Sequence, residues 1–129
     1  MPVFYEIDKA EHLIRTRCVG QVTLHEVLEH FRDLEQDADC PSYLDVMLDL
    51  TGQQTVPTSA QLQSVTDQIR RVRGTVQFGI CAIVTGSDAM YGSAMVFEVL
   101  AARNFKVTKV FPQRADAENW LAWQRSIAG

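Results

Sequence analysis

Two short apolar runs, each followed by an amphipathic helical pattern, constrain the fold of this chain more than any other feature. The run at 44–50 is nearly continuous, and the run at 78–84 is the most hydrophobic segment of the sequence. Runs of this kind are typical of strands buried on both faces, as in a parallel sheet. Apolar residues recur at helical spacing after each of them, over 59–73 and from about 89 to 104. Strands that alternate with helices in this way predict βαβ units with right-handed crossovers.

The other segments extend this pattern to the whole chain. The first two strands alternate apolar and polar residues and predict an antiparallel hairpin. Thr23 and Glu26 form a capping box, in which each side chain bonds the other residue's backbone at a helix start. The predicted elements are strands 3–7 and 13–19, a helix from Thr23 to about Ala38, strand 44–50, helix 59–73, strand 78–84, a helix to about Asn104, strand 107–111 and a helix over about 115–126. We therefore expect one α/β domain, 1–129, of order ββαβαβαβα with an open, mostly parallel sheet and an antiparallel N-terminal hairpin.

Composition narrows the function classes. Hydrophobic residues make up 47% of the 129 residues, which is enough for a core, and the formal net charge of -4 argues against a nucleic-acid-binding protein. The opening residues MPVFYEID include two acids and do not read as a signal peptide, and no apolar stretch approaches the ~20 residues of a transmembrane helix. We expect a cytoplasmic protein without a transmembrane segment. The three widely spaced cysteines predict neither a disulfide framework nor a metal site.

The sequence HEVLEH at 25–30 is similar to a zinc-protease motif, but the spacing of its two histidines differs from that motif. The motif needs its second histidine four residues after the first, on the same helix face. Here Glu29 occupies that position, and His30 falls roughly 140° around the helix from His25. We interpret the histidines as part of a solvated helix face, and we expect no metal and no cofactor.

The segment after the first apolar run is the first candidate site. Gly52 is expected to end the strand, and a polar loop follows at the carboxyl edge of the sheet, where open α/β folds usually bind ligands. Thr58 and Gln61 form a second capping box. A phosphoryl group at such a helix start would be stabilised by free amides and the helix dipole. Candidate phosphoacceptors are Thr58 and Ser59, and candidate partner-binding residues are Gly52, Gln53, Gln54, Pro57 and Thr58.

The third helix is the second candidate site. Its apolar residues spread around most of the helix, and Glu98 is its single charge between 89 and 102. One face must enter the core, and the rest is either shielded by neighbouring elements or exposed for a partner or an apolar ligand. The candidates for an apolar ligand contact or an interface, including a homodimer, are Met90, Tyr91, Met95 and Phe97.

In this order, the elements resemble the STAS domain, and most closely the SpoIIAA-like group of small bacterial proteins. The resemblance covers nearly the whole chain and is carried by the hairpin before Thr23, by LDLTG at 48–52 and by the helix that begins at Thr58. It implies a four- or five-stranded sheet with helices wound against it. In anti-anti-sigma factors a serine at the comparable helix start is phosphorylated to switch partner binding. Thr58 falls at that position, with Pro57 in place of the family's Asp and Ala60 where Gly is frequent.

Two functions from different classes follow. The resemblance implies a non-enzymatic regulatory or protein-interaction module, which is phospho-switched if Thr58 is the acceptor. The alternative is a carrier or sensor of a small apolar, lipid-like ligand held beneath the third helix, because the fold resemblance extends to CRAL-TRIO lipid-transfer domains. We expect a regulator to have a filled core, and a carrier to have a cavity of ~300 Å³ or more lined by residues such as Met90, Met95 and Phe97. An enzyme would show convergent polar groups of perturbed pKa in a cleft.

Overall fold

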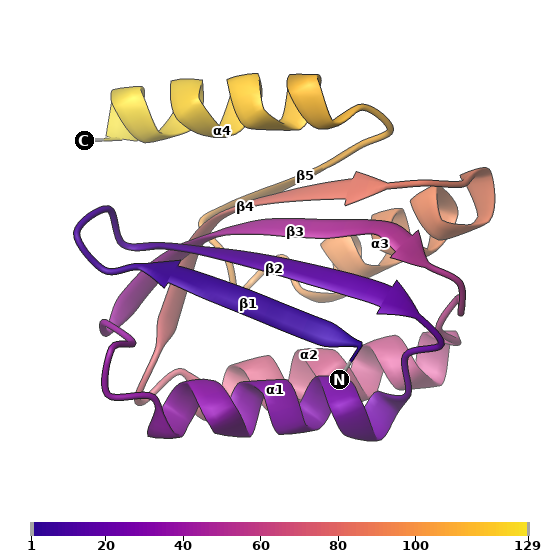
Figure 1. Cartoon of the computed structure of the whole chain (residues 1–129), viewed down its shortest axis with the longest axis horizontal. Coiled ribbons are helices and arrows are strands. Elements are labelled where there is room, and N and C mark those ends of the chain that lie inside the picture. Colours follow the sequence, from indigo (N-terminus) through magenta and orange to yellow (C-terminus); the bar gives the residue numbers. More distant parts are fainter. Residues whose placement is uncertain (1, 129) are drawn as a thin grey trace.

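The computed structural model describes residues 2–128 and confirms the predicted order of elements. Its strands are β1 (Val3–Asp8), β2 (Leu13–Gly20), β3 (Tyr43–Gln53), β4 (Gln77–Thr85) and β5 (Val107–Phe111). Its helices are α1 (Leu24–Gln36), α2 (Ser59–Val72), α3 (Asp88–Leu100) and α4 (Arg114–Ala128). The five strands form one sheet in the order β1-β2-β3-β4-β5, with β1 antiparallel to β2 and the other neighbours parallel (Figure 1).

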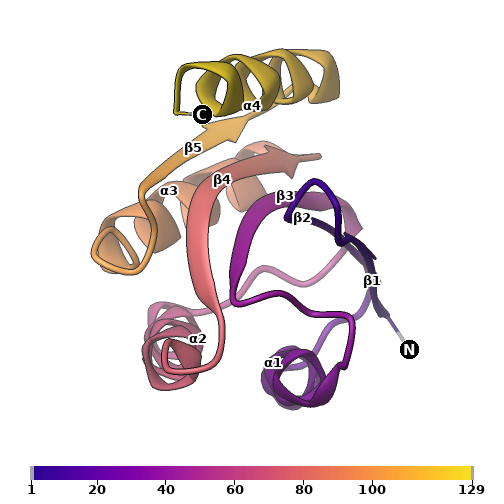
Figure 2. The same cartoon turned by 90° about the vertical axis from the view of Figure 1, so that its left-hand side faces the viewer.

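The strand order explains the layers. Because each parallel strand is added on the same side of the previous one, right-handed crossovers place α1, α2 and α3 on the same face of the sheet. The last helix, α4, lies on the opposite face (Figure 2). The order never reverses among the parallel strands, so the sheet has no topological switch point and none of the crevice that such a point opens.

Each face of the sheet has its own core. The residues between the sheet and α1–α3 form the larger cluster, centred on Ile14, Leu44 and Ile83, each at most 1% exposed. Residues from β2, β3, β4 and β5 form the smaller cluster with Ala117 and Leu121 of α4. The larger cluster therefore depends on three helices that approach the sheet from one side.

Both predicted capping boxes are present. The Thr23 hydroxyl accepts a bond from the amide of Glu26 at 3.2 Å, and the Glu26 carboxylate accepts from the Thr23 amide at 2.9 Å. Thr58 and Gln61 make the same reciprocal pair at 3.2 and 2.8 Å. These four side chains satisfy backbone donors that the first helical turn leaves free.

Two predicted boundaries were wrong. Strand β3 does not stop at Gly52, because Gly52 pairs with Val19 and Gln53 pairs with Gly20 of β2. Helix α3 ends at Leu100, four residues before Asn104, and the chain then turns.

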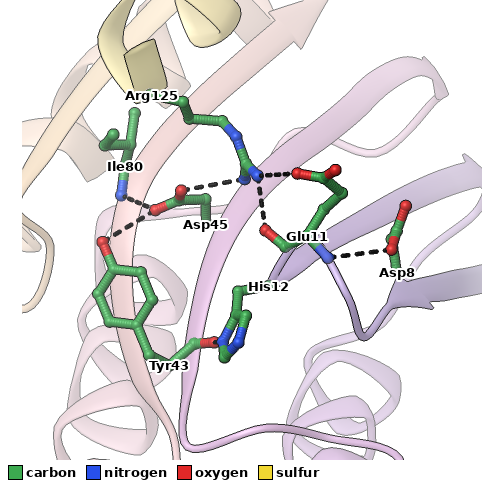
Figure 3. Close-up of polar contacts among 7 residues, drawn as sticks. All are labelled: Asp8, Glu11, His12, Tyr43, Asp45, Ile80 and Arg125. Carbon is green, nitrogen blue, oxygen red and sulfur yellow. Dashed lines mark hydrogen bonds and ion pairs between the residues drawn. The ribbon is translucent and has the colours of Figure 1, made fainter. Parts of the chain in front are cut away.

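A buried polar cluster fixes the amino end of β3 to α4 (Figure 3). The Asp45 carboxylate, 6% exposed, accepts bonds from the Tyr43 hydroxyl at 3.0 Å, the Ile80 amide at 2.8 Å and Arg125 at 3.0 Å. Burial and the bond to Asp45 raise the pKa of Tyr43 to about 12. Gly79 is required here, since a Cβ would lie 1.8 Å from the Tyr43 hydroxyl oxygen. Every oxygen of this carboxylate has a partner, so the cluster has a structural role.

Candidate ligand-binding cavity

A cavity of about 460 Å³ lies between the sheet and helices α1, α2 and α3. Its walls come from all three helices and from β2, β3 and β4, with Leu48 and Ile83 on the sheet side and Leu62 and Ala94 on the helix side. The residues that line it are mostly aliphatic or aromatic, and within residues 2–128 the lining contains no Lys, Arg, Asp or Glu. The cavity is therefore suited to an apolar molecule of small size.

The cavity explains why several apolar residues are only half-buried. Phe31 of α1, Leu48 and Leu50 of β3 and Val65 of α2 pack against the larger core, yet each keeps an accessible side. All four line the cavity. Their accessible surface thus faces an internal space, and the amphipathic stripes of α1 and α2 do not fill the volume that they enclose.

An aromatic chain forms one wall of the cavity. It runs from His30 to Phe31, Phe78, Phe105 and Phe97, with successive ring centroids 5.4, 6.1, 5.8 and 6.2 Å apart. All five rings line the cavity; Phe78 lies at the amino end of β4, and Phe105 precedes the start of β5 by two residues. Tilted and edge-to-face contacts of this kind hold the rings in place. The end of the cavity at the amino edge of the sheet is accordingly a fixed apolar surface.

The opposite end reaches the carboxyl edge of the sheet. There the lining comes from residues 22–24, before and at the start of α1, and from the connection between β3 and α2. Val56 of this connection is 47% exposed although it lines the cavity, which places an opening beside it. We call residues 53–57 the mouth segment.

Thr55 ties the mouth segment to the start of α1. Its hydroxyl donates to the Val22 carbonyl at 3.0 Å and accepts from the Val22 amide at 3.1 Å. Within the segment, the Gln53 side chain donates to the Thr55 carbonyl at 2.8 Å. Side-chain bonds of Thr55 thus join the two edges of the opening, in addition to the backbone bond from the Gln54 amide to the Gly20 carbonyl at 2.8 Å.

Polar side chains are a minority of the cavity lining. Ser93 of α3 is a lining residue, but its hydroxyl oxygen is covered by protein atoms and has no hydrogen-bond partner in the described part of the chain. His30 of α1 is 9% exposed, and burial lowers the pKa of its imidazole to about 4. Burial raises the pKa of Cys18 to about 11, with a smaller contribution from the charge of Asp49. At neutral pH the imidazole and the thiol are both uncharged, so the cavity walls carry no formal charge.

The structure divides the residues predicted for the two sites. Four of them line the cavity: Gln53, Pro57, Met90 and Phe97. The other six do not line it, namely Gly52, Gln54, Thr58, Ser59, Tyr91 and Met95. Met95 was wrongly predicted as a lining residue, because its side chain is 40% exposed on the outer side of α3. The loop and the third helix, treated separately in the sequence, border the same cavity.

Thr58 and Ser59 lie exposed at the start of α2, next to the mouth segment. The Thr58 hydroxyl acts as the helix cap described above. The role of either residue as a phosphoacceptor stays a prediction.

Sequence reasoning missed His30 and Ser93. The prediction that both histidines lie on a solvated face holds for His25, whose side chain is 78% exposed, and is wrong for His30. The signal was the spacing, because His30 follows Val27 by three residues and precedes the buried Leu34 by four. Ser93 has the same relation to Met90 and Phe97 of α3. Each polar side chain shares a face with apolar residues that enter the core.

The described residues show neither a metal cluster nor a spanning helix. Within 2–128, no three His, Cys, Asp or Glu side chains are gathered as potential metal ligands. No helix in that range combines the length and the apolar character needed to cross a membrane. The cytoplasmic location stays a prediction.

Comparison with solved structures decides the fold class. A protein of the DUF3478 family from Shewanella loihica PV-4, described as having a SpoIIAA-like fold, superposes with a TM-score of 0.57. The match covers 92% of this chain and 91% of that chain at 15% sequence identity. The fold is SpoIIAA-like. No protein-family model matches the chain, and no curated protein matches it.

At this identity, the likeness shows a SpoIIAA-like fold and nothing about function. It confirms the fold that the sequence resemblance predicted, down to the mixed five-stranded sheet and the order of its elements. The solved neighbour is itself described as uncharacterised. The function must therefore be argued from the cavity.

Proposed function

We propose that this SpoIIAA-like protein binds a small apolar molecule in the cavity beneath its sheet, as a carrier or sensor. The observation that carries the proposal is the size of the cavity, about 460 Å³, together with its apolar and uncharged walls. That volume lies within the ~300–1,000 Å³ range of small-molecule sites. At the ~30 Å³ that a water molecule occupies in the liquid, it corresponds to about 15 non-hydrogen atoms.

The apolar walls around a space of this size support a ligand. The cavity opens beside Val56, so its aliphatic and aromatic lining is accessible to solvent, and apolar surface in contact with water is unfavourable. A sequence selected for stability alone would fill such a space with larger side chains, and a bound apolar molecule restores the missing contacts.

The cavity also favours a ligand-binding function over two other functions, an interaction module and an enzyme. A pure interaction module was expected to have a filled core, and this core is not filled. The groups of shifted pKa in the lining, His30 and Cys18, are held neutral by burial and lack the charged partner that would activate a nucleophile or a base. Non-enzymatic action stays a prediction that these environments support.

The test is a titration of the purified, delipidated protein with prodan, a small uncharged fluorophore that brightens in apolar surroundings. We expect a saturable increase with one site per chain in the wild type. Ala94→Phe should weaken binding at least ~10-fold, because Ala94 lines the cavity, is 4% exposed and would project the new ring into the ligand space. Gly92→Ala on the same helix is the matched control, since a Cβ there meets no atom within 4 Å.

Stability measurements show whether a loss of prodan binding comes from a filled cavity or from a misfolded variant. Ala94→Phe should be at least as stable as the wild type without ligand, because the ring fills space that was empty. If that variant does not fold, Val65→Trp fills the cavity from α2 instead. The proposal fails if prodan does not bind saturably to the wild type, or if it binds equally well to a folded cavity-filled variant.

A regulatory role at the start of α2 is the second candidate, and a specific observation favours it. Thr58 is exposed at a helix N-terminus, where a phosphoryl group would be stabilised by the free amides and the dipole. Mass spectrometry of the protein purified from its own host is the test. Phosphate on Thr58 or Ser59 would support the switch, and unmodified peptides under every growth condition would contradict it.

A further inference from the structure

We infer that the ligand of this cavity is an uncharged molecule with one hydroxyl group, which the side chains of His30 and Thr16 hold against the wall formed by α1 and β2. The inference rests on the proposed function and specifies the chemistry of its ligand. It starts from two buried polar side chains of the lining that make no side-chain hydrogen bond within residues 2–128, Thr16 at 5% exposure and His30 at 9%.

The register of the N-terminal hairpin brings these two side chains to one wall of the cavity. Thr16 of β2 pairs directly with Tyr5 of β1, so both side chains lie on the same face of the sheet. The Tyr5 ring in turn contacts the His30 ring of α1, with centroids 5.2 Å apart. Ile14 and Cys18, two residues before and after Thr16, also line the cavity, as expected for alternate residues of a strand. Thr16 and His30 thus both adjoin Tyr5, and both reach the cavity.

The other serine, threonine and glutamine side chains of the lining are either bonded or covered. Those at the opening make hydrogen bonds of 2.8–3.0 Å to other protein groups, namely Thr23, Gln53, Thr55 and Gln61. Protein atoms cover the Ser93 hydroxyl oxygen, so a ligand cannot reach it. The polar atoms of Thr16 and His30 are not among the covered, unpaired atoms, so they are accessible from the cavity.

A hydroxyl group is the ligand group that suits this pair. A neutral imidazole offers one donor and one acceptor, and a threonine hydroxyl can donate or accept. A ligand hydroxyl can therefore accept from one of them and donate to the other, whichever nitrogen of His30 carries the proton. Without a partner, both buried side chains would cost free energy that Val and Phe at these positions would not. A polar group that arrives with the ligand explains why the sequence has Thr16 and His30 here.

The absence of charge in the lining disfavours an ionic ligand. A carboxylate or phosphate inside the cavity would need a cationic partner, and the described lining contains no Lys or Arg. Burial lowers the pKa of His30 to about 4, so its imidazole does not supply that charge at pH 7. An ammonium group would equally need an acid, and the lining contains no Asp or Glu.

The rest of the ligand is expected to be hydrocarbon. Helix α2 lies between α1 and α3, so the α3 wall is on the far side of the cavity from the polar pair (Figure 2). Apart from Ser93, that wall contributes Met90, Ala94 and Phe97. The cavity therefore fits a molecule with a hydroxyl at one end and an apolar body that extends towards α3, such as a medium-chain alcohol or a small isoprenoid alcohol.

The test compares decanol with 1-fluorodecane, in which fluorine replaces the hydroxyl, and with decanoate and decylammonium, each competed against prodan at pH 7. Thr16→Val and His30→Phe keep the approximate shape of each side chain and remove its hydrogen-bonding atoms. Each should weaken decanol roughly fivefold relative to 1-fluorodecane, as the loss of one hydrogen bond. Both ions should bind the wild type at least ~10-fold more weakly than decanol, because their charge has no partner in the cavity.

Thr108→Val and His25→Phe are the matched controls, because neither residue lines the cavity, and both should leave the ratio of decanol to 1-fluorodecane affinity unchanged. Urea unfolding shows which variants are folded. The inference is overturned if either ion binds as tightly as decanol, or if a folded variant of Thr16 or His30 leaves that ratio unchanged, since water alone would then pair with these side chains. Failure of every probe, prodan included, would instead reject the proposed function itself.

Discussion

His30 should make the stability of this protein depend on pH in a direction that can be calculated. Its imidazole is 9% exposed, packs 5.2 Å from the Tyr5 ring and 5.4 Å from the Phe31 ring, and lines the apolar cavity. Burial lowers its pKa from 6.5 to about 4. The unfolded chain therefore binds a proton between these pH values that the folded chain does not.

The sign and size of this pH dependence follow from the difference in bound protons between the unfolded and folded states. Because the unfolded state binds more protons, the free energy of unfolding falls as the pH falls from about 6.5 towards 4. The lowering of the pKa by roughly 2.5 units corresponds to about 3 kcal/mol at 1.36 kcal/mol for each unit, of which about 2 kcal/mol should be lost by pH 5. Above pH 7 the histidine should contribute no pH dependence.

Urea unfolding followed by circular dichroism at several pH values between 7.5 and 4.5 measures this effect. The His30→Phe variant keeps an aromatic ring beside Tyr5 and Phe31 but cannot titrate. Its stability relative to the wild type should rise by about 2 kcal/mol between pH 7.5 and pH 5. His25→Gln is the control, because His25 is exposed on the same helix and its removal should leave the pH profile unchanged.

Equal pH slopes for the wild type and His30→Phe would refute the reasoning. Such a result would mean that water reaches the imidazole in the folded protein, and hence that the cavity around it is wet. The experiment therefore also reports whether the space next to His30 is dry.

Three further predictions concern other elements. Gly79→Ala should destabilise the protein by ~2 kcal/mol or more in urea unfolding, because the new Cβ would displace the Tyr43 hydroxyl from Asp45, whereas the control Gly92→Ala should stabilise it by ~0.5–1 kcal/mol. Thr58→Ala should cost ~1 kcal/mol through loss of the α2 cap, and an unchanged stability would contradict the cap. Met95→Lys should change the oligomeric state without unfolding the chain if α3 forms a dimer contact; a wild type that stays monomeric at all concentrations in light scattering would reject that contact.

The sequence predicted the fold because each element carries its own local signal. Caps at Thr23 and Thr58 follow from side chains three residues apart, and the buried strands follow from continuous apolar runs. The end of β3 was misjudged because Gly52 was taken as a stop. Its pairing with Val19 is a contact between distant segments that no local pattern records.

The cavity could not be predicted in the same way. An apolar stripe looks identical whether its residues pack against the sheet or border an unfilled space, so Leu24 and Phe31 gave no sign that they line a cavity. The sequence did indicate the two segments that border it, the β3–α2 connection and α3. These two segments border one cavity because of the distance between the three helices and the sheet. That distance is set by tertiary packing.

The most direct test of the central claim is a methyl NMR titration of the delipidated protein with decanol. The account predicts saturable shifts for methyl groups that line the cavity, such as those of Leu48, Ile83 and Ala94, and none for exposed methyl groups on the outside of α3, such as Val99 at 75% exposure. Shifts confined to Val99 and Met95, with the cavity methyl groups unchanged at saturation, would show that apolar molecules bind the surface and would contradict the account.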